Sequence, residues 1–346
     1  MKNKRKKLFD LKFTILMPVY NGAKIISSTL RSILSQSFDN FEIIVGDDCS
    51  TDDTVKKVKK FQKEDKRIKI FVNKKNLGYS KNLENLRQKA TGDIIYLMGQ
   101  DDILAKDALL KTYNAFKISE DIGAVTRPYF WFYEDIKRPV RIKKRISDKK
   151  DTLLTIKSPF KDIITMFSTL DQLSGLAFRR KYIDIPFHED IFPCHVYPFA
   201  SIFKKHPVVF LKDYLVAVRI TSSQARKVSW IYDKSPMKSW ADMFETVYKE
   251  KKYEKFRQRM IGDFVATNYV GLLQIKNYSR HNYLYTLREI YYLLKYRLKN
   301  FFSPAFWLFS VLSLLIPPVI LIRLADWYKN NIYSLAIGKV EFHYKL

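Results

Sequence analysis

Short apolar runs alternate with stretches of helical spacing through the first third of the chain. The runs are rich in β-branched and aromatic residues and occupy 13–17, 41–45, 68–72 and 93–98. Their length and composition predict strands, and the apolar residues that recur at helical spacing between them predict helices. Strands separated by helices indicate an α/β fold with a mostly parallel sheet, right-handed crossovers and flanking helices.

Polar residues follow the predicted strands directly. Residues 18–22 stop the first run, residues 46–54 close the second, and Asp101 and Asp102 come just after the fourth. Ligands of open α/β sheets collect outside the carboxyl ends of the strands. We therefore expect the functional site at this edge of the sheet.

The adjacent carboxylates of Asp101 and Asp102 have two interpretations. At the end of a buried strand they repel one another unless a proton or a cation intervenes, and a divalent ion with oxygen ligands meets that need. Alternatively, Asp102 caps a helix that begins near Ala105, with Asp101 in solvent. The two residues alone favour the cap, but the repeated strand-then-helix pattern around them tips the balance towards a metal site.

Two familiar nucleotide-binding devices are missing from the sequence. No Gly-x-Gly-x-x-Gly follows the first predicted strand, and no Gly-x-x-x-x-Gly-Lys occurs in the chain. Neither a dinucleotide-binding fold nor a P-loop is supported. A phosphate ligand here needs another device, such as a metal held by carboxylates.

Four motifs in order over roughly the first 120 residues resemble those of the inverting family-2 glycosyltransferases, which have a GT-A fold. They are Pro18-Val19-Tyr20-Asn21, Asp47-Asp48-x-Ser50-x-Asp52-x-Thr54, Asn76-x-Gly78 with Asn82, and Ala90-Thr91-Gly92-Asp93. The chain departs from the family's common Asp-x-Asp-Asp motif, because Gly99 stands where the first acid usually is.

The resemblance implies a nucleotide-sugar site. Pro18 and Tyr20 would flank the nucleobase, and Asp48, with Asp47 as runner-up, would accept the N3–H of uracil or thymine, which cytosine lacks. Asp101 and Asp102 would hold Mg²⁺ or Mn²⁺, and Gln100 would take over the ribose contact. The implied nucleotide-sugar residues are Pro18, Val19, Tyr20, Asn21, Asp47, Asp48, Asn76, Gly78, Asn82, Gln100 and Asp101.

The resemblance leaves the catalytic base open. An inverting transferase needs a group that takes the acceptor proton as the hydroxyl attacks. The segment 174–180 resembles the strand that closes the acceptor side in this family, and Glu189 and Asp190 follow it slightly early, whereas His195 occupies the usual acidic position. Asp190, Glu189 and His195 are therefore all candidates. The polar segment 219–227 either closes over the diphosphate or is an exposed loop.

Charge and the carboxyl-terminal apolar segment indicate the partners. The net charge of +27, with basic residues from Lys2, Lys4, Arg5, Lys6 and Lys7 onwards, favours polyanions, either nucleic acid or an anionic membrane. Residues 301–322 carry no charge, but Pro304, Pro317 and Pro318 interrupt them. We expect an interfacial or re-entrant helical hairpin rather than a clean membrane span, with an ordinary buried helix as the alternative.

The two cysteines, Cys49 and Cys194, give no disulfide framework and fit a reducing cytoplasm.

Together these features predict a GT-A catalytic domain over 1–230 and a helical, membrane-associating region over 231–346. The donor half would cover about 10–125 and the acceptor half about 126–230. The expected function is metal-assisted, inverting transfer of a sugar from a UDP- or dTDP-sugar to an acceptor hydroxyl in cell-surface polysaccharide synthesis, at the cytoplasmic face of the cell membrane. The basic and apolar carboxyl-terminal region and the habit of the family favour a lipid-linked saccharide as acceptor, with a soluble glycan as the alternative. A sugar nucleotidyltransferase and a basic nucleic-acid-binding protein are the alternatives, although no specific nucleic acid is expected.

Overall fold

The computed structural model describes residues 9–222, 224–337 and 340–346. The basic run Lys2, Lys4, Arg5, Lys6 and Lys7 and residue Ser223 of the predicted polar segment lie outside the described residues.

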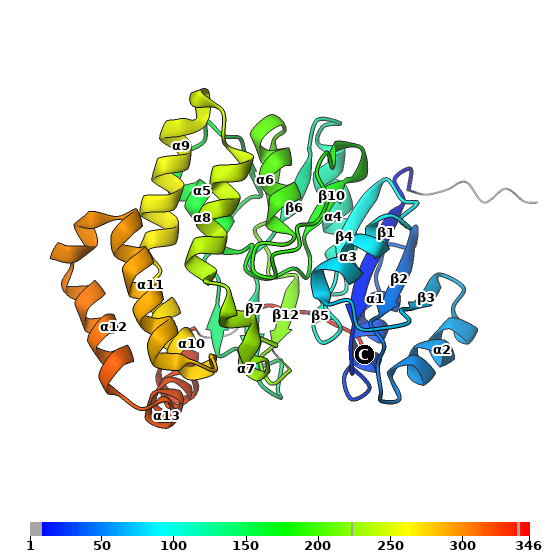
Figure 1. Cartoon of the computed structure of the whole chain (residues 1–346). Coiled ribbons are helices and arrows are strands. Elements are labelled where there is room, and N and C mark those ends of the chain that lie inside the picture. The colour runs from blue at the N-terminus through cyan, green and yellow to red at the C-terminus, as the bar shows by residue number, and fades with distance from the viewer. Residues whose placement is uncertain (1–8, 223, 338–339) are drawn as a thin grey trace, which may run out of the picture.

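A central eight-stranded sheet runs through the molecule (Figure 1). Strands β1, β2, β3 and β4 are mutually parallel, as predicted, whereas β10 runs antiparallel to both of its neighbours, so the sheet is mixed. In spatial order the strands are β3 (Ile68–Val72), β2 (Phe41–Asp47), β1 (Phe13–Val19), β4 (Ile94–Leu97), β10 (Ala177–Arg179), β6 (Ala124–Thr126), β11 (Val208–Phe210) and β9 (Thr152–Leu154).

A second sheet of four strands lies beside the first. Its order is β5 (Ile103–Leu104), β12 (Val216–Arg219), β7 (Phe130–Phe132) and β8 (Arg141–Ile142). The apolar residues of 208–218 read as one strand in the sequence, but they form two, because β11 and β12 belong to different sheets. The chain turns between them at Lys212 and Asp213, and Asp213 pairs with Lys111 at 2.7 Å.

Helices cover the central sheet. The crossover helices of the first half are α1 (Ile26–Leu34), α2 (Thr54–Glu64), α3 (Tyr79–Arg87) and α4 (Ala108–Lys117), and those of the second half are α5 (Phe160–Ser168) and α6 (Val196–Lys205). The apolar faces of α1 and α4 share one cluster with β1 and β2, and α5 and α6 share another with α8 (Pro236–Val247). The expected α/β architecture with flanking helices is confirmed.

The carboxyl-terminal region is helical. After α7 (Gln224–Lys227) and α8 come α9 (Glu254–Arg259), α10 (Val270–Tyr278), α11 (Asn282–Tyr296), α12 (Pro304–Leu315), α13 (Pro318–Tyr328) and α14 (Ser334–Ile337). The apolar segment 301–322 forms two helices that part at Pro317, so the prolines break it as predicted. Among the described residues, no helix has the length and apolarity needed to cross a membrane.

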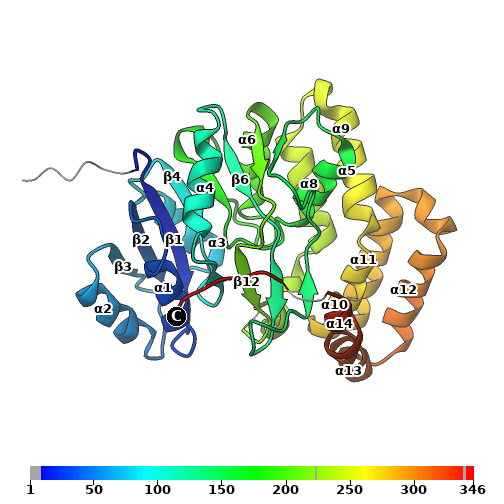
Figure 2. The same ribbon diagram turned by 180° about the vertical axis from the view of Figure 1, so that it is seen from behind.

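The chain end returns to the first half of the molecule. Figure 2 shows the last residues running from α14 towards α1. The N–H of Lys106 donates to the carbonyl of His343 at 2.7 Å, and Ser35 donates to the carbonyl of Lys345 at 3.1 Å. This tail therefore ties the helical region to the sheet that carries the predicted site.

Glu42 on β2 is a buried charged residue between the first strands. It is 4% exposed and accepts hydrogen bonds from Thr14 at 2.7 Å, Thr91 at 2.6 Å and Lys69 at 2.9 Å. Burial alone raises the pKa of Glu42, but these donors outweigh it and lower the pKa to about 2. The ionised carboxylate of Glu42 thus connects β2 to β1, to β3 and to the turn before β4.

We expect Glu42→Gln to lower the free energy of unfolding by about 2 kcal/mol at pH 7, because hydrogen bonds to a charged group are lost. The folded pKa lies below the unfolded value of about 4.3. The stabilisation is therefore present above that pH and is lost as the pH falls through about 2. Urea denaturation at a series of pH values measures it, with the exposed Glu64→Gln as control. A deficit that stays constant down to pH 2 would contradict the assignment.

Candidate functional site

Side-chain hydrogen bonds connect the loop after β1 to the loop after β2. The N–H of Asn21 donates to Ser50 Oγ at 2.9 Å, and the N–H of Thr51 donates to Asn21 Oδ1 at 2.9 Å. Asn21 adopts a left-handed conformation with φ of 47°, which asparagine tolerates better than most residues. The structure therefore joins the first two predicted motifs, and Asn21 shapes the site through its own side chain.

Asp48 joins a third loop to these two. Its N–H donates to the carbonyl of Val19 at 2.8 Å. Its Oδ1 accepts from Asn73 at 2.9 Å and from the N–H of Leu77 at 2.8 Å, and its Oδ2 accepts from the N–H of Gly78 at 2.8 Å. Asp48 is 3% exposed, so these donors hold its carboxylate in one orientation. Oδ2 retains a lone pair for a further donor.

The remaining nucleotide-site candidates divide into surface and supporting residues. Tyr20 is 40% exposed at the end of β1, beside the partly buried Pro18. Val19 is packed in the core, and the buried Asn82 donates to the carbonyl of Gly46 at 2.8 Å, so both support the loops from behind. Asn76 accepts from the N–H of Gly78 at 3.0 Å and shapes the turn before α3.

Asp47 is buried, but fewer donors fix its carboxylate than fix the carboxylate of Asp48. One of its carboxylate oxygens accepts from the N–H of Ser50 at 2.9 Å, and the other has no hydrogen-bond partner among the described residues. Asp47 therefore fixes the turn after β2.

Gln100, which follows β4, forms two hydrogen bonds with the backbone at the end of β1. Its side-chain oxygen accepts from the N–H of Tyr20 at 3.0 Å, and its side-chain nitrogen donates to the carbonyl of Tyr20 at 3.1 Å. Both polar atoms of the amide therefore hold the backbone that carries the exposed tyrosine ring. To make the predicted contact with a ribose, Gln100 would have to give up one of these two hydrogen bonds.

Asp102 does not cap a helix. Strand β5 begins at the next residue, and α4 begins only at Ala108. Asp102 is 1% exposed and accepts from Ser174 Oγ at 2.5 Å and from the N–H of Arg219 at 3.2 Å. Burial, followed by repulsion from Asp101, raises its pKa well above the ordinary value. The helix-cap interpretation of this pair is wrong.

Asp101 is the more accessible carboxylate of the pair. Ser222 Oγ donates to it, and burial raises its pKa, while Arg219 and Lys227 act in the opposite direction. Two adjacent carboxylates that are costly to ionise suit a divalent cation, which would lower that cost. No group of three or more His, Cys, Asp and Glu side chains is arranged for a metal within 9–222, 224–337 and 340–346. Other oxygens would have to complete the coordination.

The structure adds Arg127, which sequence reasoning missed. It follows β6, is 1% exposed, and donates to the carbonyls of Ser174 and Gln172, the latter at 3.0 Å. Its Nε has no hydrogen-bond partner among the described residues, and its charge lies near both Asp102 and Asp171. Its position directly after an apolar strand is the feature of the sequence that could have identified Arg127 as a site residue.

The predicted bases lie in different environments. His195 is 4% exposed, with Nε2 at 2.8 Å from the carbonyl oxygen of Leu170 and Nδ1 at 3.2 Å from the hydroxyl of Tyr79. Asp190 is 7% exposed, and its Oδ1 has no partner in the described part of the chain. Glu189 is exposed and lines a hollow of about 260 Å³ beside α3.

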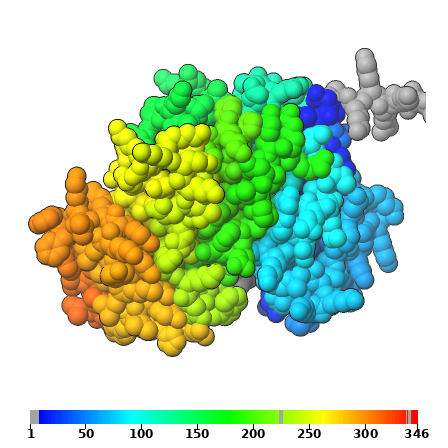
Figure 3. Space-filling view, turned by 45° about the horizontal axis from the view of Figure 1, so that its top comes forward, coloured from blue at the N-terminus to red at the C-terminus, as the bar shows by residue number. Residues whose placement is uncertain are grey.

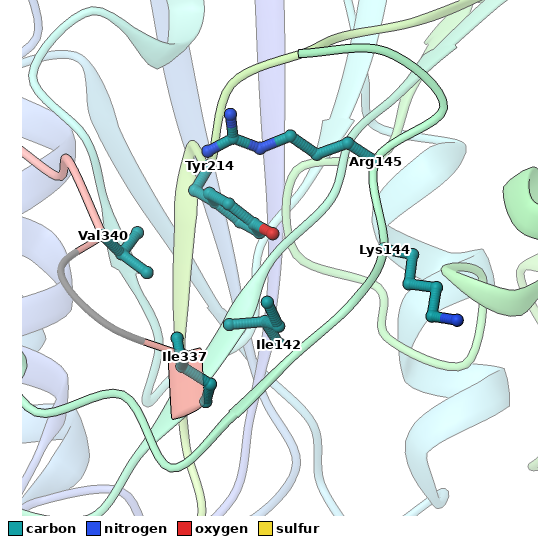
Figure 4. Close-up of a pocket in the computed structure, with 6 residues that line it drawn as sticks. All are labelled: Ile142, Lys144, Arg145, Tyr214, Ile337 and Val340. Atoms are coloured by element: carbon teal, nitrogen blue, oxygen red, sulfur yellow. The ribbon is translucent and has the colours of Figure 1, made fainter. Parts of the chain in front are cut away.

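A larger hollow of about 440 Å³ lies at the second sheet (Figure 4). It is lined by Ile142, Lys144, Arg145, Tyr214, Ile337 and Val340. The guanidinium of Arg145 lies 4.2 Å from the centre of the Tyr214 ring. None of the predicted site residues lines this hollow, so the sheet edge at β1, β2 and β4 remains the candidate site.

Comparisons with known proteins support the family resemblance and the fold. The sequence model of glycosyl transferase family 2 matches residues 14–184. A curated relative, the GalNAc(5)-diNAcBac-PP-undecaprenol beta-1,3-glucosyltransferase of Campylobacter jejuni, is 36% identical over 99 residues, which are 28% of this chain and 32% of the relative. The matches to the first curated relatives span 40% or less of their length.

Solved structures share the fold over nearly the whole chain. Residues 1–349 of Staphylococcus aureus TarS, in complex with UDP-GlcNAc, match with a TM-score of 0.61 and 16% identity, covering 95% of this chain and 93% of that one. A mannosyltransferase of Pyrobaculum calidifontis, in complex with GDP-Man and Mn²⁺, matches with a TM-score of 0.53 and 14% identity, covering 97% and 92%. Both likenesses establish the fold, which is GT-A.

We expect Ser174→Ala to lower the free energy of unfolding by about 2 kcal/mol, because it leaves the buried Asp102 carboxylate and the N–H of Gly99 without their shared partner. Ser222→Ala is the matched control. It removes a similar hydroxyl from the more accessible Asp101 and should cost less than about 1 kcal/mol. Urea denaturation measures both. Equal losses would show that Ser174 does not fix Asp102.

Proposed function

Because this chain carries a glycosyl transferase family 2 domain over residues 14–184, we propose that it transfers a sugar from a UDP- or dTDP-sugar to an acceptor hydroxyl, with inversion. The observation that carries the choice of donor is the fixed carboxylate of Asp48, whose N–H donates to Val19, the residue before the exposed Tyr20. The sugar nucleotidyltransferase and the nucleic-acid-binding protein are not favoured by the family match.

The nucleobase would stack on Tyr20 and donate its N3–H to Asp48. Uracil and thymine carry that N–H, whereas cytosine presents an acceptor, which a carboxylate repels. Hydrogen bonds from Asn73, Leu77 and Gly78 orient the carboxylate of Asp48 before the base binds. Binding therefore costs little conformational entropy at this side chain. Asp47, held to Ser50, is the less suitable partner.

The diphosphate would lie at Asp101 and Asp102. Mg²⁺ or Mn²⁺ held there would act as a Lewis acid for the leaving diphosphate. Arg219 and Lys227 lie close enough to Asp101 to affect its ionisation, and they would add positive charge for the phosphates. The acceptor proton would pass to a base among Asp190, Glu189 and His195.

The acceptor would be a lipid-linked saccharide at the cytoplasmic face of the cell membrane. The Campylobacter relative carries a lipid-linked acceptor in its name. In this chain Leu298, Phe302, Leu315 and Leu335 are 74–83% exposed, and Lys299 and Arg323 among them are also exposed. Figure 3 shows part of this helical region at the end of the molecule opposite the first strands. Apolar and basic side chains on one region suit an anionic bilayer surface.

We expect uridine and thymidine diphosphates to raise the thermal midpoint in the presence of Mn²⁺, and cytidine diphosphate to leave it nearly unchanged. Ligand at about 100 times its dissociation constant adds roughly 2.7 kcal/mol of stability. Asp48→Ala should remove the preference among bases, and Asp101→Ala should remove the part of the shift that depends on Mn²⁺. The exposed Asp39→Asn is the control. Equal shifts for all diphosphates in the wild type would exclude base recognition by Asp48.

We expect the double variant Phe302→Glu and Leu315→Glu to reduce binding to vesicles of phosphatidylglycerol and phosphatidylcholine by tenfold or more, since burial of each side chain is worth about 1.5–3 kcal/mol. Vesicle flotation measures the bound fraction. Ile118→Glu, at an exposed apolar position after α4, serves as control. Undiminished flotation of the double variant would refute docking through this surface.

A further inference from the structure

We propose that Tyr79 and His195 form the proton acceptor of the transfer reaction, with Tyr79 contacting the acceptor hydroxyl and His195 receiving the proton behind it. The inference rests on the proposed function and names the base that the sequence left open. The hydrogen-bonded chain from Tyr79 through His195 to Leu170 carries it.

The partners of His195 fix which ring nitrogen carries the proton. A backbone carbonyl oxygen can only accept, so the Nε2 that lies 2.8 Å from Leu170 O carries a hydrogen. In the neutral ring, Nδ1 then has a free lone pair, and the hydroxyl of Tyr79 at 3.2 Å donates to it. The imidazole is thus oriented to take a proton from Tyr79.

Access separates the roles of the two residues. His195 is 4% exposed, so an acceptor saccharide does not reach its ring. Tyr79 is only partly buried, and it is the first residue of α3, directly after the Gly78 that donates to Asp48. Tyr79 is therefore the less buried residue of the pair, and it adjoins the loop that holds Asp48.

His195 lies near Arg127, which connects it to Asp102. The charges of Arg127 and Asp171 both act on His195, and Arg127 also acts on Asp102. Arg127 donates to the carbonyl of Ser174, whose hydroxyl donates to Asp102. The pair thus lies between the loop that holds Asp48 and the residues that hold Asp102.

The proton transfer balances without any further reactant. As the acceptor oxygen forms its bond to the anomeric carbon, the bond from that carbon to the diphosphate breaks, and its electron pair leaves with the diphosphate. The acceptor proton passes to the phenol oxygen of Tyr79, while the phenol proton passes to Nδ1 of His195. The imidazolium then returns a proton through Tyr79 to solvent.

The ionisation of both groups suits this sequence. Burial raises the pKa of Tyr79 well above its usual value, so the residue is a phenol with a proton to give. Burial lowers the pKa of His195 to about 4, so the ring is neutral at pH 7 and ready to accept. Asp171 favours the imidazolium and Arg127 opposes it. A pKa near 4 matches that of an ordinary carboxylate base.

Of the competing carboxylates, Asp171 has two strong partners, Asp190 is nearly buried and Glu189 is exposed. Asp171 is 44% exposed in its side chain, but Tyr129 donates to its Oδ1 at 2.5 Å and Lys143 pairs with its Oδ2 at 2.8 Å. The side chain of Asp190 is nearly buried. Their variants nevertheless provide the comparison that decides between the pair and a carboxylate.

The test compares Tyr79→Phe and His195→Gln with Asp190→Asn and Asp171→Asn in full-length protein. Release of UDP is followed from UDP-glucose, UDP-galactose and UDP-N-acetylglucosamine with Mn²⁺, with water as acceptor, and UDP binding is followed by thermal shift. Tyr182→Phe, which removes a phenol hydroxyl that donates to the carbonyl of Glu120 and not to His195, is the control.

We expect Tyr79→Phe and His195→Gln to lower kcat by about 10²-fold or more, with KM for the donor and the UDP-induced shift unchanged. Sodium azide, a nucleophile with no proton to lose, should restore turnover in Tyr79→Phe. Loss of kcat without rescue by azide would indicate a structural role and overturn the proposal, as would full activity of Tyr79→Phe beside an inactive Asp190→Asn or Asp171→Asn. The same assay is run with dTDP-glucose and dTDP, and a wild type that binds neither UDP nor dTDP would overturn the proposed function itself, and this inference with it.

Discussion

The carboxylate of Asp48 holds together three loops, and the geometry of the site depends on it. It accepts hydrogen bonds from Asn73, Leu77 and Gly78, while its own N–H donates to Val19 at the end of β1. Gly78, with φ of 82°, starts α3 at Tyr79. A single buried carboxylate therefore sets the exit of β1, the turn after β2 and the entry of α3.

The second constraint is the cost of burying two carboxylates at the end of β4. Hydroxyl groups of Ser174 and Ser222 and the N–H of Arg219 satisfy part of the hydrogen-bonding capacity of Asp101 and Asp102. The raised pKa of both residues shows that these donors do not offset burial completely. A divalent cation held between the two carboxylates would lower this remaining cost, because it would favour their ionised forms.

An ion pair and a hydrogen bond connect the carboxyl-terminal helices to the rest of the chain. Asp326 on α13 accepts from Arg226 on α7 at 2.8 Å and from Tyr133 at 2.9 Å. Helix α7 belongs to the same segment as Ser222, which donates to Asp101. Binding of α12 and α13 to a lipid surface would therefore place the site at a fixed height above that surface.

The sequence by itself determined the local elements and the order of the motifs. The apolar runs that became β1 to β4 and the proline break at Pro317 could be found from residue patterns, because strand, helix and turn preferences act over a few positions. The motifs at Asp48 and Asp101 were placed correctly at strand ends for the same reason.

The tertiary structure alone decided which side chains of the candidate site meet. Tyr79 meets His195 across 116 residues, Ser174 meets Asp102 across 72, and Ser222 meets Asp101 across 121. Those contacts follow from the insertion of β10 between β4 and β6 and from the division of 208–218 between two sheets. Strand order is fixed by the packing of the whole core, which no local pattern contains.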